Sequence, residues 1–280
     1  MSHPAIAKDN VAVITGGASG IGFAAAKRFL QAGMKVAIAD IGADHLARAE
    51  ELLANAAAGE VLALQTDVSR PEQLEALQAA VIARFGGVDV LMNNAGIEPN
   101  SSALGPRDAY ERIIGVNLWG VIHGTQIFAP GMIARGRPGL IINTGSKQGI
   151  TTPPGNPAYN VSKAGVKAFT EALAHELRNT AGCAVTAHLL IPGFVFTALT
   201  ARGRSEKPAG AWTPDETIDF MLARLAERDF YILCPDNDVP RDLDERRIAW
   251  AAGDIIENRP ALSRWHKDYA DAFKAFVEGK

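Results

Sequence analysis

The sequence predicts a doubly wound α/β fold in a single domain, and two observations lead to this prediction. Short runs rich in β-branched residues alternate with longer runs rich in Ala and Leu through the first ninety residues, which is typical of strand, helix and strand in a parallel sheet. The short runs are also almost continuously apolar, so helices must cover both faces of the sheet. In such a fold the ligand lies across the carboxyl ends of the strands.

The predicted elements follow this rhythm from the N-terminus. The first four strands are expected at Val11–Thr15, Lys35–Ala39, Val61–Gln65 and Val88–Met92, with helices at Gly20–Ala32, Ala43–Ala57 and Pro71–Phe85. A helix at 109–134, a strand at 140–143, a loop rich in Gly, Pro, Ser and Thr at 144–157 and a helix from Ala158 come next. The last strand is expected at Asp229–Leu233.

A glycine-rich turn, TGGASGIG, joins the first strand to the first helix between Thr15 and Gly22. Backbone N–H groups and the helix dipole at such a turn attract a pyrophosphate, and glycines let the backbone approach it. The glycines at 16, 20 and 22 fit this purpose better than the GxGxxG/A frame that begins at Gly20, which starts too deep in the turn. We therefore predict a dinucleotide site here.

The next strand ends carry candidate partners for the nucleotide. Asp40 ends the second strand, where a carboxylate can accept hydrogen bonds from ribose hydroxyls and repel a 2'-phosphate. Positions 17, 19 and 41 supply no Arg or Lys to offset that repulsion, so NAD is preferred over NADP; the alternative is a solvated strand-end residue. Asp67 could contact the adenine or cap the helix that begins near Pro71. After the fourth strand, Asn94-Ala95-Gly96 would let a cofactor lie close to the backbone.

A serine, a tyrosine and a lysine follow at a spacing that suits proton transfer. Ser146 comes just after a strand end, and Tyr159 and Lys163 are four apart on the next helix, on one face. A free tyrosine has a pKa near ~10, and a neighbouring ammonium lowers that pKa. By itself the pair could arise by chance. Asn117, in the middle of a predicted helix, is either turned outward or held for a purpose.

With these motifs assembled, residues 9–200 resemble the short-chain dehydrogenase/reductase family. Its TGxxxGxG pattern is met by Thr15–Gly22, its NNAG by Asn93–Gly96, and its PG segment by Pro192–Thr197; its catalytic Asn, Ser and YxxxK are met by Asn117, Ser146, Tyr159 and Lys163. The resemblance implies a Rossmann-type, mostly parallel, seven-stranded sheet. It also implies hydride transfer between NAD(H) and a secondary alcohol or ketone.

The resemblance further assigns a role to each matching residue. Tyr159 exchanges a proton with the substrate oxygen, Ser146 holds that oxygen, Lys163 binds the nicotinamide ribose and lowers the tyrosine's pKa, and Asn117 anchors a water. The cofactor is implied to lie against Gly16, Ser19, Gly20, Ile21, Gly22, Asp40, Asp67, Val68, Asn94, Ala95, Gly96, Tyr159, Lys163, Pro192, Gly193, Val195 and Thr197, the last two holding the carboxamide.

The C-terminal part departs from the family, because the usual Asp-Gly-Gly after the last strand is missing. In its place stands an extension, 241–280, with helices expected at 243–257 and 261–277 that mix aromatic residues with charges. We expect the extension to pack on its own domain (core 9–233) or on a partner subunit, rather than to close over the active site. A homodimer through the helices that carry Asn117 and Tyr159 is favoured over the tetramer.

The substrate is expected to be set by the loop 147–156 and by a lid at 198–212. The lid contains Leu199 and Trp212, which suit an apolar alcohol, and Arg202, Arg204 and Lys207, which could attract an anion. Two rival functions stay open: an NADP-dependent carbonyl reductase, and a dinucleotide-binding sensor without catalysis. The complete catalytic set argues against the sensor.

Composition excludes several other classes. The chain of 280 residues has 48% hydrophobic residues, 21% charged residues and a net charge of -3, as in ordinary soluble globular proteins, so nucleic acid is not an expected partner. No apolar run could span a membrane and no signal peptide is evident, so a cytoplasmic protein is expected. Cys183 and Cys234 suggest no disulfide framework, and 236–238 suggests a solvated turn rather than a calcium loop; no metal site is expected.

Overall fold

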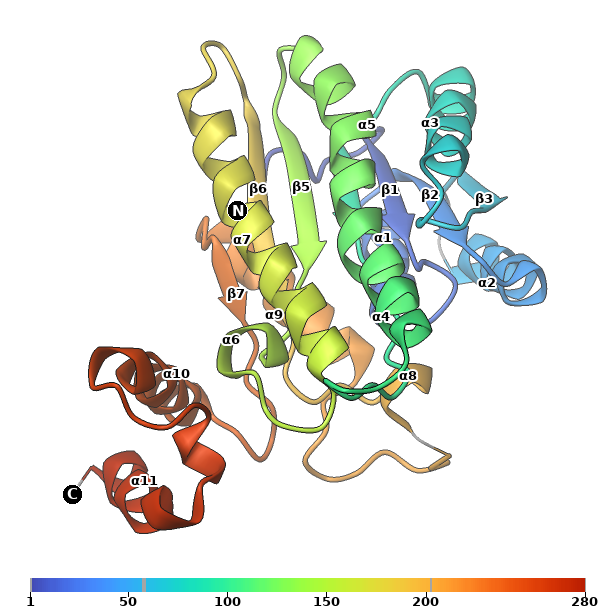
Figure 1. Cartoon of the computed structure of the whole chain (residues 1–280). Helices are drawn as coiled ribbons and strands as arrows, with labels where there is room; N and C mark the ends of the chain where they lie inside the picture. Colours follow the sequence, from blue (N-terminus) through green and yellow to red (C-terminus); the bar gives the residue numbers. More distant parts are fainter. Residues whose placement is uncertain (1, 57–58, 202, 280) are drawn as a thin grey trace.

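Seven parallel strands form one sheet in the computed structural model, which describes residues 2–56, 59–201 and 203–279 (Figure 1). The order β3-β2-β1-β4-β5-β6-β7 confirms the doubly wound fold. Strands β2 and β3 are added on one side of β1 and β4 to β7 on the other, so the strand order reverses between β1 and β4. The strands are β1 (Val11–Thr15), β2 (Lys35–Asp40), β3 (Val61–Gln65), β4 (Val90–Asn93), β5 (Gly139–Thr144), β6 (Val185–Ile191) and β7 (Tyr231–Leu233).

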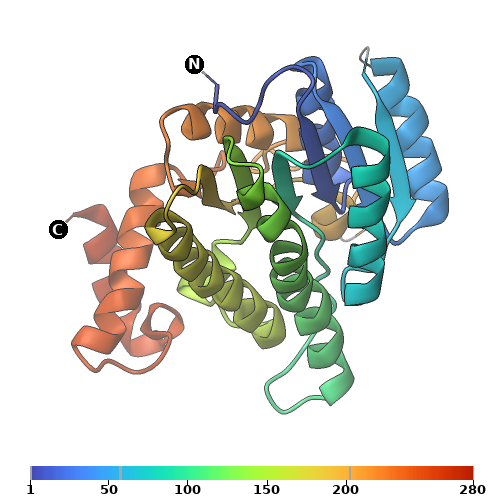
Figure 2. The same ribbon diagram turned by 90° about the horizontal axis from the view of Figure 1, so that it is seen from above.

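Helices cover both faces of this sheet, as the apolar strands require (Figure 2). One layer holds α1 (Gly20–Gln31), α2 (Ala43–Ala56) and α9 (Pro214–Ala226), and the other α3 (Pro71–Phe85), α4 (Arg107–Ile114), α5 (Gly120–Ala134) and α7 (Pro157–Asn179). The predicted end of the second helix at Ala57 lies outside the described residues. Within the described ranges, no helix has the length and apolar character needed to cross a bilayer.

Strand β1 shows why the strands are apolar throughout. Ala12 and Ile14 point into the core beneath α1 and α9, whereas Val11 and Val13 point into the core beneath α3 and α5. All four side chains are buried. Because successive residues of a strand face opposite sides, a strand between two helical layers needs apolar residues at every position.

The helix predicted at 109–134 is interrupted, which corrects the sequence-based expectation. A π-helical turn, Gly115–Trp119, separates α4 from α5, and the Gly120 N–H donates to the Gly115 carbonyl five residues earlier. The turn is centred on Asn117, which is fully buried and bonded to a neighbouring segment. Such π-turns inside α-helices occur frequently at functional sites.

Two other predicted boundaries are also wrong. The loop 144–157 contains a short helix, α6 (Gln148–Thr151), packed against α7. Strand β4 begins at Val90 rather than at Val88, and the carboxylate of Asp89, just before it, accepts from the Val11 N–H at 2.9 Å and pairs with Arg137 at 2.6 Å. Asp89 therefore ties β1 to the segment between α5 and β5.

The C-terminal extension stands beyond the β7 edge of the sheet (Figures 1 and 2). Helix α10 (Arg241–Ile256) matches its prediction and contacts α6, so it packs on its own domain. The predicted helix at 261–277 is wrong in its first half: two 3₁₀ turns precede α11 (Ala270–Glu278). The Ser263 hydroxyl accepts from the Trp250 indole N–H at 2.8 Å, which holds the first turn against α10.

Candidate active site

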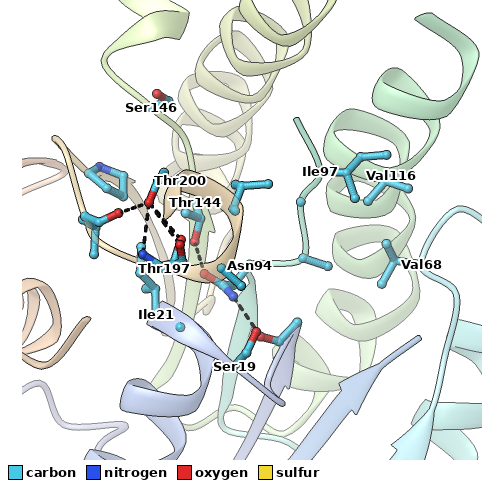
Figure 3. Close-up of a pocket in the computed structure, with 18 of the residues that line it drawn as sticks. Ser19, Ile21, Val68, Asn94, Ile97, Val116, Thr144, Ser146, Thr197 and Thr200 are labelled. Carbon is cyan, nitrogen blue, oxygen red and sulfur yellow. Dashed lines mark hydrogen bonds between the residues drawn. The ribbon is translucent and has the colours of Figure 1, made fainter. Parts of the chain in front are cut away.

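A cavity of about 330 Å³ opens at the carboxyl ends of the central strands, where the doubly wound fold predicts a ligand. Every residue predicted to bind the cofactor lines it except Gly22, and so do Ser146, Tyr159 and Lys163. In Figure 3, Val68, Ile97 and Val116 lie along one side of the cavity, and Thr144 and Thr197 lie across from them. The structure thus brings together residues that are far apart in the sequence.

The glycine-rich turn at the start of α1 is packed too closely for side chains. Gly16 has a φ of +64°, and a Cβ there would lie 2.8 Å from the Ala95 Cα. A Cβ on Gly22 would lie 2.2 Å from the Gly16 carbonyl oxygen, so Gly22 lets α1 pack on the turn instead of lining the cavity. The Asn94 amide donates to the Thr15 and Gly16 carbonyls at 3.2 and 3.3 Å, and these bonds stabilise the conformation of the turn.

The two carboxylates at the outer strand ends are held by local hydrogen bonds. Asp40 accepts from the Ala18 N–H at 3.1 Å and from the Ile41 N–H at 2.8 Å, so its charge is fixed at the cavity rim. Asp67 accepts from the N–H and the hydroxyl of Ser69 at 3.0 and 2.6 Å. Asp67 does not cap α3, whose N-cap residue is Arg70, but it does line the cavity.

Tyr159, Lys163 and Ser146 lie at one end of this cavity, at the junction of β5, α6 and α7. The Lys163 ammonium donates to the Thr144 carbonyl at 2.8 Å and lies 5.7 Å from the centre of the Tyr159 ring. The Gln148 N–H donates to the Ser146 hydroxyl at 3.1 Å. Because Gly149 has no side chain, α6 rests directly on the backbone of α7 at Lys163.

Burial shifts the pKa values of Tyr159 and Lys163 in the directions that favour the neutral form of each side chain. It raises the pKa of Tyr159, with Glu98 acting in the same direction and interaction with the Ser146 hydroxyl opposing it. It lowers the pKa of Lys163 to about 8, with Glu98 opposing. The net shift of the tyrosine's pKa is therefore upward in this structure, because loss of hydration destabilises the phenolate more than nearby groups stabilise it.

Asn117 is brought next to this group without lining the cavity. Its Oδ1 accepts from the Ile97 N–H at 2.8 Å, and its Nδ2 donates to the Ile97 carbonyl at 2.9 Å and to the Ser162 hydroxyl at 3.2 Å. The amide thus fixes the segment that follows Gly96. The oxygen keeps one lone pair for a further donor such as a water.

Two threonines at the site were missed from the sequence. Thr144, whose carbonyl accepts from Lys163, also donates from its hydroxyl to the Asn94 oxygen at 3.3 Å and links β5 to β4. Its position at a strand end, two residues before Ser146, was a usable signal. The Thr200 hydroxyl accepts from the Thr197 N–H at 3.0 Å and donates to the Val195 carbonyl at 2.5 Å; nothing in the sequence indicated this turn.

The predicted lid begins with a short helix, α8 (Ala198–Ala201). Its last residue, Trp212, forms a β-bridge with Val195, just before the lid. Leu199 lines the cavity, whereas the described basic residues do not. Arg204 donates to the Thr200 and Ala201 carbonyls and Lys207 to the Ala211 carbonyl. Arg202 lies outside the described residues.

The segment 236–238 is a turn, as expected, with Asn237 and Asp238 exposed, but its first residue is not solvated. Asp236 is buried, accepts from the Phe194 N–H at 3.1 Å and pairs with Lys147 at 3.1 Å. Asn237 accepts from the Trp212 indole N–H. No group of three or more His, Cys, Asp or Glu side chains is placed to hold a metal ion within residues 2–56, 59–201 and 203–279.

Comparison with known proteins connects this arrangement to a family. The family model described as short chain dehydrogenase matches residues 10–208. Among curated proteins, 2-(R)-hydroxypropyl-CoM dehydrogenase of Xanthobacter autotrophicus is 33% identical over 223 residues, which are 78% of this chain and 84% of that protein.

Solved structures agree with this match and differ in the nucleotide bound. A short chain dehydrogenase/reductase from Burkholderia phymatum, in complex with NAD, has a TM-score of 0.83 and 33% identity, covering 93% of this chain and 98% of the other. An alcohol dehydrogenase from Thermococcus sibiricus, complexed with 5-hydroxy-NADP, has a TM-score of 0.70 and 29% identity, covering 78% and 90%.

Proposed function

Because the chain belongs to the short-chain dehydrogenase/reductase family of oxidoreductases that act on CH–OH groups, we propose that it interconverts a secondary alcohol and its ketone with NAD(H). One observation carries this proposal: Ser146, Tyr159 and Lys163 line the same cavity as the glycine-rich turn and Asp40. The dinucleotide, when bound, supplies or accepts the hydride. The chain's own residues supply orientation and the proton.

In this proposal Tyr159 is the acid/base and Ser146 donates a hydrogen bond to the reacting oxygen. The raised pKa of Tyr159 keeps its phenol protonated at neutral pH, as a general acid for ketone reduction requires. Hydrogen bonds to an oxygen that gains negative charge stabilise the transition state more than the ground state. Lys163 binds the nicotinamide ribose, and Asn117 fixes the backbone at Ile97, next to Gly96 in the cavity wall.

The NAD preference rests on Asp40, whose carboxylate is fixed at the cavity rim by two backbone N–H groups. A fixed negative charge there repels a 2'-phosphate and accepts hydrogen bonds from ribose hydroxyls. The substrate preference rests on the lid, 198–212. Since Leu199 lines the cavity and Arg204 and Lys207 bond to lid carbonyls, we propose an uncharged, largely apolar substrate.

A panel of ketones and NADH tests the proposed activity. We expect the full chain to oxidise NADH, followed by absorbance, with at least one of cyclohexanone, 2-octanone, acetophenone and ethyl acetoacetate. Tyr159→Phe should bind NADH as the wild type does, measured by nicotinamide fluorescence, and lose at least ~100-fold in turnover, the low end for a positioned acid/base. Near-normal turnover in this variant would remove Tyr159 from the mechanism. A wild type that binds NADH but reduces no ketone would favour the sensor.

The NADP-dependent alternative is tested at Asp40. Asp40→Asn keeps an acceptor for the Ala18 N–H and removes the charge, whereas Asp40→Ala removes both. We expect the ratio of NADPH to NADH dissociation constants to fall by about tenfold or more in Asp40→Asn, which corresponds to about 1.4 kcal/mol. An unchanged ratio in both variants would show that the carboxylate does not select the nucleotide.

A homodimer is proposed through the helices that carry Asn117 and Tyr159. Trp119, beside Asn117, is 50% exposed, and Val161, on α7 near Tyr159, is 51% exposed. Large apolar side chains left in water on neighbouring helices support this face as a protein contact. The missing C-terminal ending makes a tetramer a less favoured assembly.

A further inference from the structure

Lys147, the residue after Ser146, is the junction of three segments that are distant in the sequence. Its ammonium pairs with Asp236 at 3.1 Å and with Asp244, on α10, at 2.6 Å. The same Asp236 oxygen accepts from the Phe194 N–H at 3.1 Å. Lys147 and Asp236 together thus join the loop after β5, the loop after β6 and the segment that runs from β7 into the C-terminal extension.

This junction is buried and closely packed. The Lys147 side chain is 18% exposed, and those of Asp236 and Asp244 are 5% and 6% exposed. A Cβ on Gly193 would lie 2.5 Å from the Asp236 carboxylate and 2.9 Å from the Lys147 ammonium, so the glycine makes room for the ion pair. Ion pairs of low exposure hold a definite geometry, and removing one partner leaves a buried charge.

Two of the three joined segments form the cavity. Ser146 and Gly193 line it, whereas Asp236 and Asp244 do not. Lys147 begins the turn into α6, whose first N–H, that of Gln148, donates to the Ser146 hydroxyl. A shift of Lys147 would therefore move the serine hydroxyl relative to Tyr159.

We propose that Lys147 is a positioning residue for Ser146 and that Asp244 of the C-terminal extension holds Lys147 in place. The inference rests on the proposed function, because it assigns Ser146 a role at the reacting oxygen. It gives the extension a part in catalysis without contact to the substrate. A misplacement of about 1 Å in a catalytic group can cost about 100-fold in rate, so a partial release of α6 has a measurable effect.

Kinetics of ketone reduction by NADH tests the link. Lys147→Met should lower kcat by about tenfold or more and Asp244→Asn by a smaller factor, with a larger isotope effect from NADH deuterated at the transferred hydrogen. Partial unfolding would lower the active fraction and leave both the isotope effect and KM unchanged. Lys167→Met is the matched control, because Lys167 pairs with Glu171 on the exposed side of α7. It should behave as the wild type.

A double-mutant cycle separates the route through Asp244 from a general effect. If Asp244 acts by holding Lys147, the double variant Lys147→Met/Asp244→Asn should have the kcat of Lys147→Met alone. Effects that multiply in the double variant would overturn the route. Wild-type kcat and isotope effect in Lys147→Met would overturn the proposal as a whole.

Hydrogen exchange gives a reading that does not depend on turnover. Peptides that cover 145–151 should exchange faster in Lys147→Met and in Asp244→Asn than in the wild type, with no change in Lys167→Met. If the wild type reduces no ketone, the proposed function fails and exchange alone decides the link. Exchange equal to that of the wild type in both variants would then reject it.

Discussion

Tyr159 and Lys163 show how burial sets the chemistry of single residues. Both are almost wholly removed from water, so the charged form of each is destabilised and the lysine's pKa comes down to about 8. Their positions could be predicted, because a four-residue spacing on a helix fixes a shared face. The direction of the tyrosine's shift could not, because it depends on the solvent excluded by other segments.

The pKa of Lys163 makes NADH binding depend on pH. The ammonium is present below about pH 8 and is lost as the pH rises through that value, so affinity for NADH should fall between about pH 7 and pH 9. Fluorescence titration with NADH across this range measures the effect. Lys163→Met should bind weakly at all these pH values without the fall, and a wild-type affinity that stays constant would contradict the assigned ribose contact.

The bonding partners of Lys147 and Asn117 could not be predicted from the sequence. Asp236 is 89 positions away from Lys147, and no periodicity links the two. The motif residues at strand ends were predictable because parallel strands bring their carboxyl ends to one edge. A buried ion pair between loops depends on how those loops fold over that edge.

Among the elements, the regular strands and long helices followed from their patterns, whereas the interruptions did not. The π-turn at 115–119 inserts one residue between α4 and α5, where one continuous helix was expected. Its cause is tertiary, since Asn117 is bonded to the Ile97 backbone. Likewise Gly149 lets α6 pack on the backbone of α7, and Ser263, in the first turn before α11, is bonded to Trp250; both contacts join segments that no periodicity links.

The buried charge of Asp89 is expected to contribute more to the free energy of unfolding than an exposed ion pair does. Asp89→Asn keeps an acceptor for the Val11 N–H but removes the charge that Arg135 and Arg137 contact. We expect a loss of about 1–3 kcal/mol in the free energy of unfolding, because charged hydrogen bonds to a buried group are weakened. Urea denaturation measures it.

The matched control is Glu245→Gln, which removes an exposed pair with Arg241 on α10. Surface pairs of this kind contribute about 0–1 kcal/mol. Equal destabilisation by the two substitutions would show that burial of Asp89 adds nothing.

At the scale of the whole molecule, the N-terminal segment is fastened to β6 by a chain of neutral side chains. His3 accepts from the Ala5 N–H through Nδ1 and bonds through Nε2 to the Thr186 hydroxyl at 3.1 Å. The same hydroxyl bonds to His188 at 3.1 Å. His188 in turn bonds to the Asp229 carbonyl at 2.8 Å. Burial and the second ring lower the pKa of His3 to about 4, and burial lowers that of His188.

This pair should make stability fall in mild acid. The unfolded chain binds a proton at His3 below about pH 6.5 and the folded chain does not until about pH 4. The free energy of unfolding therefore decreases as the pH falls through this window, and the lowered pKa of His188 acts in the same direction. His3 alone accounts for at most about 3 kcal/mol. Urea denaturation at pH 7 and pH 4.5 should show a smaller difference in His3→Gln than in wild type.

His175→Gln is the control, because His175 is exposed on α7. It should keep the wild-type pH dependence. If His3→Gln also keeps it, the N-terminal pair does not contribute to acid sensitivity.

The anchor at Asp236 has a consequence for synthesis of the protein. The Phe194 N–H, beside the cavity, has its acceptor 42 positions later in the chain, and Asp244 follows later still. A growing polypeptide can therefore assemble β1 to β6 while the floor of its pocket is still unfastened. Only when translation has carried the chain past these acidic positions can the Phe194 N–H and the Lys147 ammonium find their partners, so this side of the cavity is completed late in synthesis.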